Sequence, residues 1–170
     1  FPVATCSNIL SKHFEKRKIQ LGLGKELVEV KPKSKEAIFR DLLTYNIQAE
    51  KYDFLHISPP VEPPVAIAKS ELANSSGFVD VDAATLQHRR FTNVFALGDI
   101  SSSPIVRNVS AIRFQLPIVV SNIAASILGK SKLKSYDGST NHMILTAKNR
   151  GFWFKCKFNE LKVSSLFSNK

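Results

Sequence analysis

The segment with the clearest potential for chemistry is an apolar run that ends in glycine and aspartate. Residues 93–100 read NVFALGDI, a strand pattern that stops at Gly98 and Asp99, and a Ser- and Pro-containing segment typical of a helix N-terminus follows. Glycine lets a ligand approach the backbone, a carboxylate accepts hydrogen bonds from hydroxyl groups, and a helix N-terminus attracts anions. These residues predict a site for a phosphorylated, hydroxylated ligand. The same pattern also fits an ordinary turn in which Asp99 caps the helix.

The elements that would position this site alternate between helices and strands. Residues 7–19 place apolar side chains at helical spacing, and residues 19–32 and 35–42 predict a β-hairpin that turns through Lys33 and Ser34. Residues 51–58, KYDFLHIS, have the pattern of a parallel-sheet strand. The four prolines of PPVEPP then stop that strand and predict a crossing loop.

The second half of the chain predicts strands on both sides of a long helix. Residues 77–82, GFVDVD, alternate as a short strand ahead of the NVFALGD strand. Residues 101–130 predict a helix that Pro117 should kink or split in two. Residues 142–149 and 151–158 alternate polar and apolar side chains, which predicts a terminal hairpin.

Composition excludes some classes of protein. The formal net charge is +10, but the basic residues are spread along the 170-residue chain without a nucleic-acid-binding motif, so no nucleic acid is expected as a partner. The longest uncharged stretch, residues 114–128, is shorter than the roughly 20 apolar residues of a membrane span and is interrupted by polar residues, so no transmembrane helix is expected. Four scattered histidines predict no metal site.

Neither cysteine has the spacing of a redox or zinc motif. Cys6 and Cys156 lie near opposite ends of the chain, so we expect free thiols in a reducing compartment. The sequence begins at Phe1, without a methionine and without a signal or transit pattern, and we expect it to be a piece of a longer protein.

Three longer motifs together resemble the sulfide:quinone oxidoreductase family, particularly its mitochondrial type. They are LHISPPVEPP at residues 55–64, GFVDVDAATLQHRRFTNVFALGD at 77–99 and YDGST at 136–140. The resemblance covers nearly the whole chain as the C-terminal portion of such a protein. It implies a flavoprotein with two dinucleotide-binding domains, FAD as cofactor, and sulfide and quinone as substrates. It also implies a peripheral position on the mitochondrial inner membrane for the intact protein.

The resemblance assigns roles to residues around the Gly-Asp pair. Gly98 and Asp99 would line FAD, and the turn from Ile105 to Asn108 would lie near the isoalloxazine ring, with Arg107 adding positive charge there. The N-terminus of the following helix would stabilise negative charge on the reduced flavin. Gln115 matches a glutamine on the same helix, for which a packing or surface role is equally open.

Several positions depart from the family pattern. The family's redox cysteine follows Gly-Asp directly, and Ile100 stands there; isoleucine can neither attack nor carry sulfur. The second cysteine of the pair would lie before Phe1, so no catalytic residue is assigned. His142 and Met143 stand where the mitochondrial enzymes look more like Cys-Pro, and the GxGxxG fingerprint for the ADP half of FAD is absent.

The sequence therefore predicts an α/β chain with part of a Rossmann-like FAD/NAD(P)-binding flavoprotein fold and additional β-hairpins. Residues 1–60 would end the second dinucleotide-binding-like domain, 61–130 would supply the crossing loop, last strand and helix of the FAD domain, and 131–170 would be a shortened C-terminal region. We expect this chain alone not to oxidise sulfide. Two alternatives stay open: a non-catalytic paralogue that acts as an interaction module, and an NADH:quinone reductase-like flavoprotein.

Overall fold

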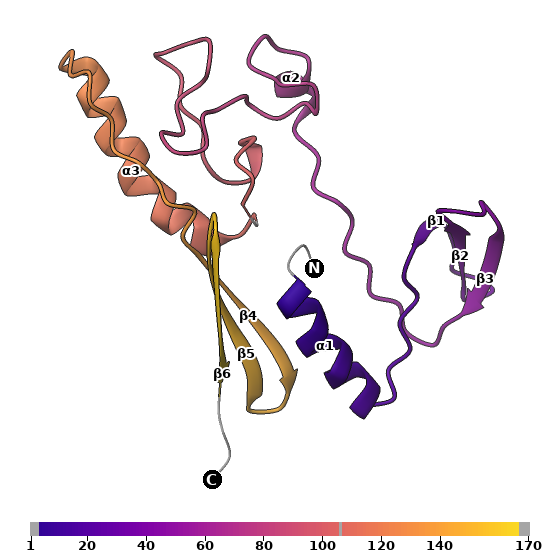
Figure 1. The fold of residues 1–170 in the computed structure, drawn as a ribbon. Coiled ribbons are helices and arrows are strands. Elements are labelled where there is room, and N and C mark those ends of the chain that lie inside the picture. The colour runs from indigo at the N-terminus through magenta and orange to yellow at the C-terminus, as the bar shows by residue number, and fades with distance from the viewer. Residues whose placement is uncertain (1–3, 106, 167–170) are drawn as a thin grey trace. The chain divides into compact units, whose positions relative to one another are not determined.

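The structure is a computed structural model that describes residues 4–105 and 107–166. The chain divides into two compact units, Phe1–Pro59 and Pro60–Lys170, which are described separately (Figure 1). The described residues form a mixed α and β structure with two three-stranded sheets, both antiparallel. The mixed class predicted from the sequence is confirmed, whereas the Rossmann-like part of that prediction stays a prediction.

The first unit contains helix α1 (Ala4–Lys16) and a meander of β1 (Lys25–Lys31), β2 (Glu36–Asp41) and β3 (Ile47–Lys51). The predicted helix and hairpin are confirmed. Ala37 and Ile38 on β2 are buried, and β3 is exposed along its whole length. The turn between β2 and β3 forms because the Asp41 carboxylate accepts hydrogen bonds from the backbone N–H groups of Leu43 (2.9 Å) and Thr44 (2.7 Å).

The strand predicted at residues 51–58 is wrong. β3 ends at Lys51, and residues 52–64 have no helix or strand. The apolar residues that suggested a buried strand lie on the surface instead, since Phe54 is 86% exposed and Ile57 is 48% exposed. The composition of the segment resembles a parallel strand, but within the described part of the chain no strand pairs with it.

The second unit contains α2 (Val65–Ala68), the 3-10 turn η1 (Gly98–Ile100), α3 (Val109–Ile127), and a sheet of β4 (Thr140–Ala147), β5 (Arg150–Lys157) and β6 (Glu160–Leu166). The terminal hairpin is confirmed, with β6 as an additional third strand. The core of this unit combines residues from the loops and from α3: Val79, Val81, Leu86, Ala96, Val119 and Tyr136.

Residues 69–97 fold without regular strands, so the strands predicted at 77–82 and 93–100 are wrong. Single β-bridges replace them, such as Val81 with His88 and Gln87 with Phe95. Tight turns prevent longer ladders: the Asp82 carboxylate accepts from Ala84 N (3.1 Å) and Thr85 N (2.8 Å), and the chain reverses there. The hydrogen bonds from Thr85 lower the pKa of Asp82.

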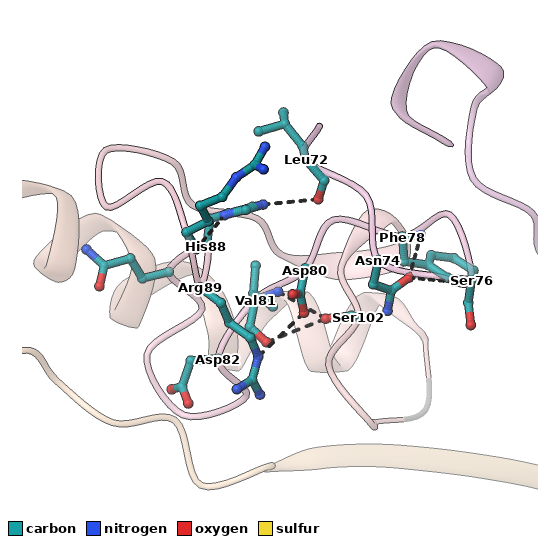
Figure 2. Close-up of polar contacts among 12 residues, drawn as sticks. Leu72, Asn74, Ser76, Phe78, Asp80, Val81, Asp82, His88, Arg89 and Ser102 are labelled. Atoms are coloured by element: carbon teal, nitrogen blue, oxygen red, sulfur yellow. Dashed lines mark hydrogen bonds and ion pairs between the residues drawn. The ribbon is translucent and has the colours of Figure 1, made fainter. Parts of the chain in front are cut away.

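The His88 ring connects its own turn with the segment around Leu72 (Figure 2). The residue is 4% exposed, Nδ1 lies 3.0 Å from both Arg90 N and Phe91 N, and Nε2 lies 3.1 Å from the Leu72 carbonyl oxygen. Because backbone N–H groups only donate, Nδ1 must accept, and the proton must lie on Nε2, which donates to Leu72. The ring thus supplies hydrogen bonds that a sheet would otherwise provide.

Helix α3 is continuous, and Pro117 does not split it. It begins at Val109, so the helix start predicted at residue 101 is wrong. The Asn108 side chain caps it by accepting from Ala111 N (2.8 Å). By length and composition alone α3 is long and apolar enough to span a membrane. The expectation of no transmembrane helix considered only the uncharged residues 114–128, whereas the helix starts five residues earlier, at Val109. Its polar buried residues, described below, hold it against its own unit.

Candidate functional site

Gly98 occupies a backbone conformation and a space that other residues fit poorly. Its φ is +70°, the residue is buried, and a Cβ built on it would lie 3.0 Å from Ile112 Cγ1 of α3. The Gly98 N–H donates to Gln115 Oε1 at 2.8 Å, and its carbonyl accepts from Ser101 Oγ at 3.0 Å. The turn η1, named the Gly98 turn below, therefore packs against α3, and hydrogen bonds fix both the N–H and the carbonyl group of Gly98.

Asp99 and Ile100 differ in their exposure to solvent. Asp99 is exposed, while Ile100 is partly buried and packs against the hydrophobic core of the second unit. Asp99 does not cap α3, since Asn108 is the N-cap, so the interpretation of Asp99 as a helix cap is wrong. The carboxylate stays accessible to a ligand, and the isoleucine contributes to packing.

Arg107 is an exposed residue in the segment between the Gly98 turn and α3. Its guanidinium carbon is 4.0 Å from the centre of the Phe78 ring, and Nη2 donates to the Ser101 carbonyl at 3.4 Å. The arginine is exposed but held in place, which distinguishes it from a freely solvated surface residue. Val106, in the same turn, lies outside the described residues.

Asn108 attaches the start of α3 to the start of β4. Besides capping the helix, its Oδ1 accepts from Thr140 Oγ1 (3.0 Å) and its Nδ2 donates to the Asn141 carbonyl (3.3 Å). Ser110 Oγ accepts from Asn141 N at 3.0 Å. The Asn108 side chain thus bonds within the protein through both its oxygen and its nitrogen, so its contribution to a ligand site would be to orient the helix N-terminus.

Gln115 connects the Gly98 turn with the YDGST segment. It is 2% exposed, and besides its bond to Gly98 it hydrogen-bonds with the Tyr136 hydroxyl, which itself donates to the Ser139 carbonyl at 2.8 Å. Burial raises the pKa of Tyr136 to about 12, with the Gln115 bond lowering it and the nearby Asp137 raising it. Of the two roles left open for Gln115, the structure shows packing. A polar residue in an apolar helix was the only sequence signal.

One buried polar atom near the turn has no partner. Among the described residues, Ser103 Oγ is the buried side-chain nitrogen or oxygen without a hydrogen bond, and Ser103 is 5% exposed. An unsatisfied buried hydroxyl is unfavourable, so such atoms often mark a place that a ligand or water completes. Nothing in the sequence distinguished Ser103 from the serines beside it.

The one cysteine whose side chain the structure describes, Cys156, lies in the terminal sheet. Cys156 on β5 is a free thiol whose pKa is raised by burial, so it is a poor nucleophile. It lines a cavity of about 350 Å³ together with Phe114 of α3 and Thr140 of β4. The Cys6 side chain lies outside the described part of the chain. Among the residues searched, no three His, Cys, Asp or Glu side chains gather as a metal site.

Comparison with curated proteins finds three relatives with the same description. The chain is 39%, 38% and 31% identical to the mitochondrial sulfide:quinone oxidoreductases of Dictyostelium discoideum, Schizosaccharomyces pombe and Mus musculus, over 86–88% of its length. It spans only about a third of each relative, 32–34%, as the C-terminal portion. The resemblance inferred from the sequence is confirmed. No protein-family model matches the chain.

Comparison with solved structures finds the fold in a large assembly. One chain of the cryo-EM structure of the Tetrahymena thermophila mitochondrial ATP synthase superimposes with a TM-score of 0.84 over 91% of this chain, at 24% identity. This chain covers 37% of that chain. At this identity the likeness establishes a shared fold.

Proposed function

We propose that the chain is the C-terminal portion of a sulfide:quinone oxidoreductase-like FAD flavoprotein in which the sulfur chemistry at position 100 has been lost. The observation that carries this proposal is the 3-10 turn η1, in which Gly98 is held by Gln115 and Ile100 packs against the core. The similarity to three mitochondrial sulfide:quinone oxidoreductases supports the family function, a mitochondrial location, and sulfide and quinone as the substrates of intact relatives.

The residues around the turn fit part of a flavin site. Gly98 allows close approach, Asp99 offers an exposed carboxylate for hydroxyl groups, and the buried Ser103 hydroxyl lacks a partner. Arg107 would supply positive charge, and Asn108 would orient the N-terminus of α3. Bound there, FAD would accept two electrons and pass them on. The helix N-terminus and Arg107 would stabilise the negative charge that this reduction creates.

Ile100 removes the group that the family uses on sulfur. A side chain without a thiol cannot form a disulfide or a persulfide, and the Cys156 thiol lies on β5 of the terminal sheet. We therefore expect flavin binding without sulfide oxidation. Substituting cysteine at position 100 would also leave the thiol partly buried against the core, where its pKa would be raised and its reactivity low.

A second candidate function is that of a non-catalytic subunit in a larger complex. The specific observation in its favour is the shared fold with a chain of the Tetrahymena mitochondrial ATP synthase. Loss of the redox cysteine is compatible with this role, because a structural subunit retains the fold and its hydrogen bonds without needing a nucleophile.

The test is isolation of the native protein followed by absorbance spectroscopy before and after addition of sulfide. A flavin spectrum that sulfide does not bleach supports the first proposal, and rapid bleaching would contradict the assigned loss of sulfur chemistry. A colourless protein that co-purifies with a large complex would favour the second candidate. Asp99→Ala should reduce flavin retention, while Asp53→Ala, at an exposed aspartate of the first unit, serves as the matched control.

A further inference from the structure

The cavity beside Cys156 is separate from the residues assigned to the flavin site. Its volume of about 350 Å³ lies within the range of sites for small molecules. Its walls come from α3, from the start of β4 and from the neighbouring ends of β5 and β6, and three lysines are among them: Lys155, Lys157 and Lys162. We name it the sheet cavity.

The register of the terminal sheet places positive charges side by side. Lys155 on β5 pairs with Asn141 of β4 on one side and with Lys162 of β6 on the other. Residues directly opposite each other point to the same face of a sheet, and Lys157, two positions along β5, shares that face. Like charges in directly opposite positions destabilise a sheet. The Lys155–Lys162 pair is therefore unfavourable for the fold by itself.

Carboxylates of the same unit offset only part of this charge. Lys162 Nζ lies 3.0 Å from Glu160 Oε1, and Lys157 Nζ lies 2.7 Å from Asp137 Oδ2. Lys155 has no ion-pair partner among the residues that the structure describes. An anion between Lys155 and Lys162 would compensate the uncovered charge and relieve the repulsion between the two ammonium groups.

An amide and an aromatic ring complete the walls of the sheet cavity. Asn141 bonds to Asn108 and Ser110 through its backbone carbonyl and N–H, so its side-chain amide remains as a hydrogen-bond donor. Phe114 of α3 is 41% exposed and offers an apolar surface to the organic part of a ligand. A lysine ammonium is a compact charge without the planar fork by which arginine holds a carboxylate, and it binds phosphate well.

We propose that the sheet cavity binds a small phosphate monoester. The phosphate lies between the ammonium groups of Lys155 and Lys162 and accepts a hydrogen bond from the Asn141 amide, and the organic part packs against Phe114. This inference goes beyond the proposed function, because binding here requires neither FAD nor sulfide.

The experiment is a titration of the full chain with phenyl phosphate at constant ionic strength, followed by two-dimensional NMR of the backbone amides. We expect saturable shifts at Asn141, Lys155 and Lys162, and none with phenol, which lacks the phosphate. The double variant Lys155→Gln, Lys162→Gln should weaken binding roughly tenfold or more, because two charge-assisted hydrogen bonds are lost.

The matched control is the double variant Lys132→Gln, Lys148→Gln. Both lysines are exposed residues of the second unit outside the sheet cavity, so this variant removes the same charge elsewhere. Its affinity for phenyl phosphate should stay within about twofold of wild type, because distant exposed charges are screened. Equal weakening by both double variants would show general charge attraction and overturn the proposal, as would a wild-type chain without saturable shifts.

Two further measurements locate the ligand. Phe114→Ala should weaken phenyl phosphate several-fold but leave the affinity for inorganic phosphate within about twofold, and equal effects on both would contradict the position of the organic part. Phenyl phosphate should also slow alkylation of Cys156, which lines the sheet cavity, as measured by peptide mass spectrometry. An unchanged rate at saturation would place the ligand elsewhere and overturn the proposal.

Thermal unfolding separates binding from folding. Without ligand, the Lys155→Gln, Lys162→Gln variant should unfold no earlier than wild type, because it loses a like-charge contact and only an exposed ion pair to Glu160. Earlier unfolding would assign the two lysines to the fold and contradict the proposal. Phosphatidic acid vesicles that capture the wild-type chain but not this variant, with no binding of phenyl phosphate, would overturn it in favour of a lipid headgroup.

Discussion

Substitution of Gln115 by leucine tests whether one buried amide holds the Gly98 turn. Leucine has a similar size and suits an apolar environment, so packing changes little, but the Gly98 N–H loses the Gln115 Oε1 acceptor at 2.8 Å. A buried N–H without a partner costs about 1–3 kcal/mol. The Tyr136 hydroxyl keeps its bond to the Ser139 carbonyl, so a second unsatisfied group is not created. We expect a loss of about 2 kcal/mol in the free energy of unfolding.

The assay is thermal and urea unfolding, with hydrogen exchange at the Gly98 amide as the local measurement. For a unit of roughly a hundred residues, about 2 kcal/mol corresponds to a fall in Tm of about 8 °C. Exchange at Gly98 should accelerate, and the pKa of Tyr136 should rise above its value of about 12, because Gln115 lowers it. Gln48→Leu, at an exposed glutamine on β3, should change stability by less than about 0.5 kcal/mol. A loss for Gln115→Leu no larger than for this control would refute the reasoning.

Three further substitutions test other parts of the second unit. Gly98→Ala should cost about 2 kcal/mol or more in unfolding free energy, because φ is +70° and the new Cβ would lie 3.0 Å from a side-chain carbon of α3; wild-type stability would show that the turn shifts freely. His88→Ala should cost about 3 kcal/mol in urea unfolding, since two backbone donors and one carbonyl lose a buried partner, whereas the exposed His56→Ala should cost little. Bonds from Lys157 and Ser139 lower the pKa of Asp137 from 3.8 to about 2, so its stabilisation is complete above the higher value and is lost as pH falls through the lower one. Because Asp137 is half exposed, we expect it to contribute under about 1 kcal/mol to the free energy of unfolding. Asp137→Asn should remove this contribution from the acid dependence of stability, and an unchanged dependence of stability on pH would contradict the assignment.

Local patterns predicted the elements whose hydrogen bonds are local. α1, the β1–β2 hairpin, α3 and the β4–β5 hairpin follow from periodicity and turn residues, and the structure contains each of them. The strands expected at 51–58, 77–82 and 93–100 failed for a different reason. A strand needs a neighbouring strand, and within the described residues these segments meet single bridges or no strand partner.

The residues of the candidate site stay predictions, and the hydrogen bonds that connect them could not be predicted from the sequence. The pattern around Gly98 and the resemblance identified the turn, yet the bond from Gln115 spans 17 residues and is not visible in either motif. The resemblance assigned Asn108 to the flavin site, which stays a prediction, and neither motif indicated that its side chain bonds to α3 and β4. Long-range bonds of buried side chains depend on tertiary packing, which residue types and spacing do not encode directly.

The bonds that connect α3 to β4 have a consequence for the order of events during synthesis. Asn108 and Ser110 bond to residues 31–33 positions later in the chain, and Asn122 bonds to Lys134. A ribosome that has released α3 but not yet β4 would expose a helix whose start lacks these partners. Ordering of the helix start should therefore be a late event, and a nascent chain arrested before residue 140 should be cleaved by proteases near residues 107–110.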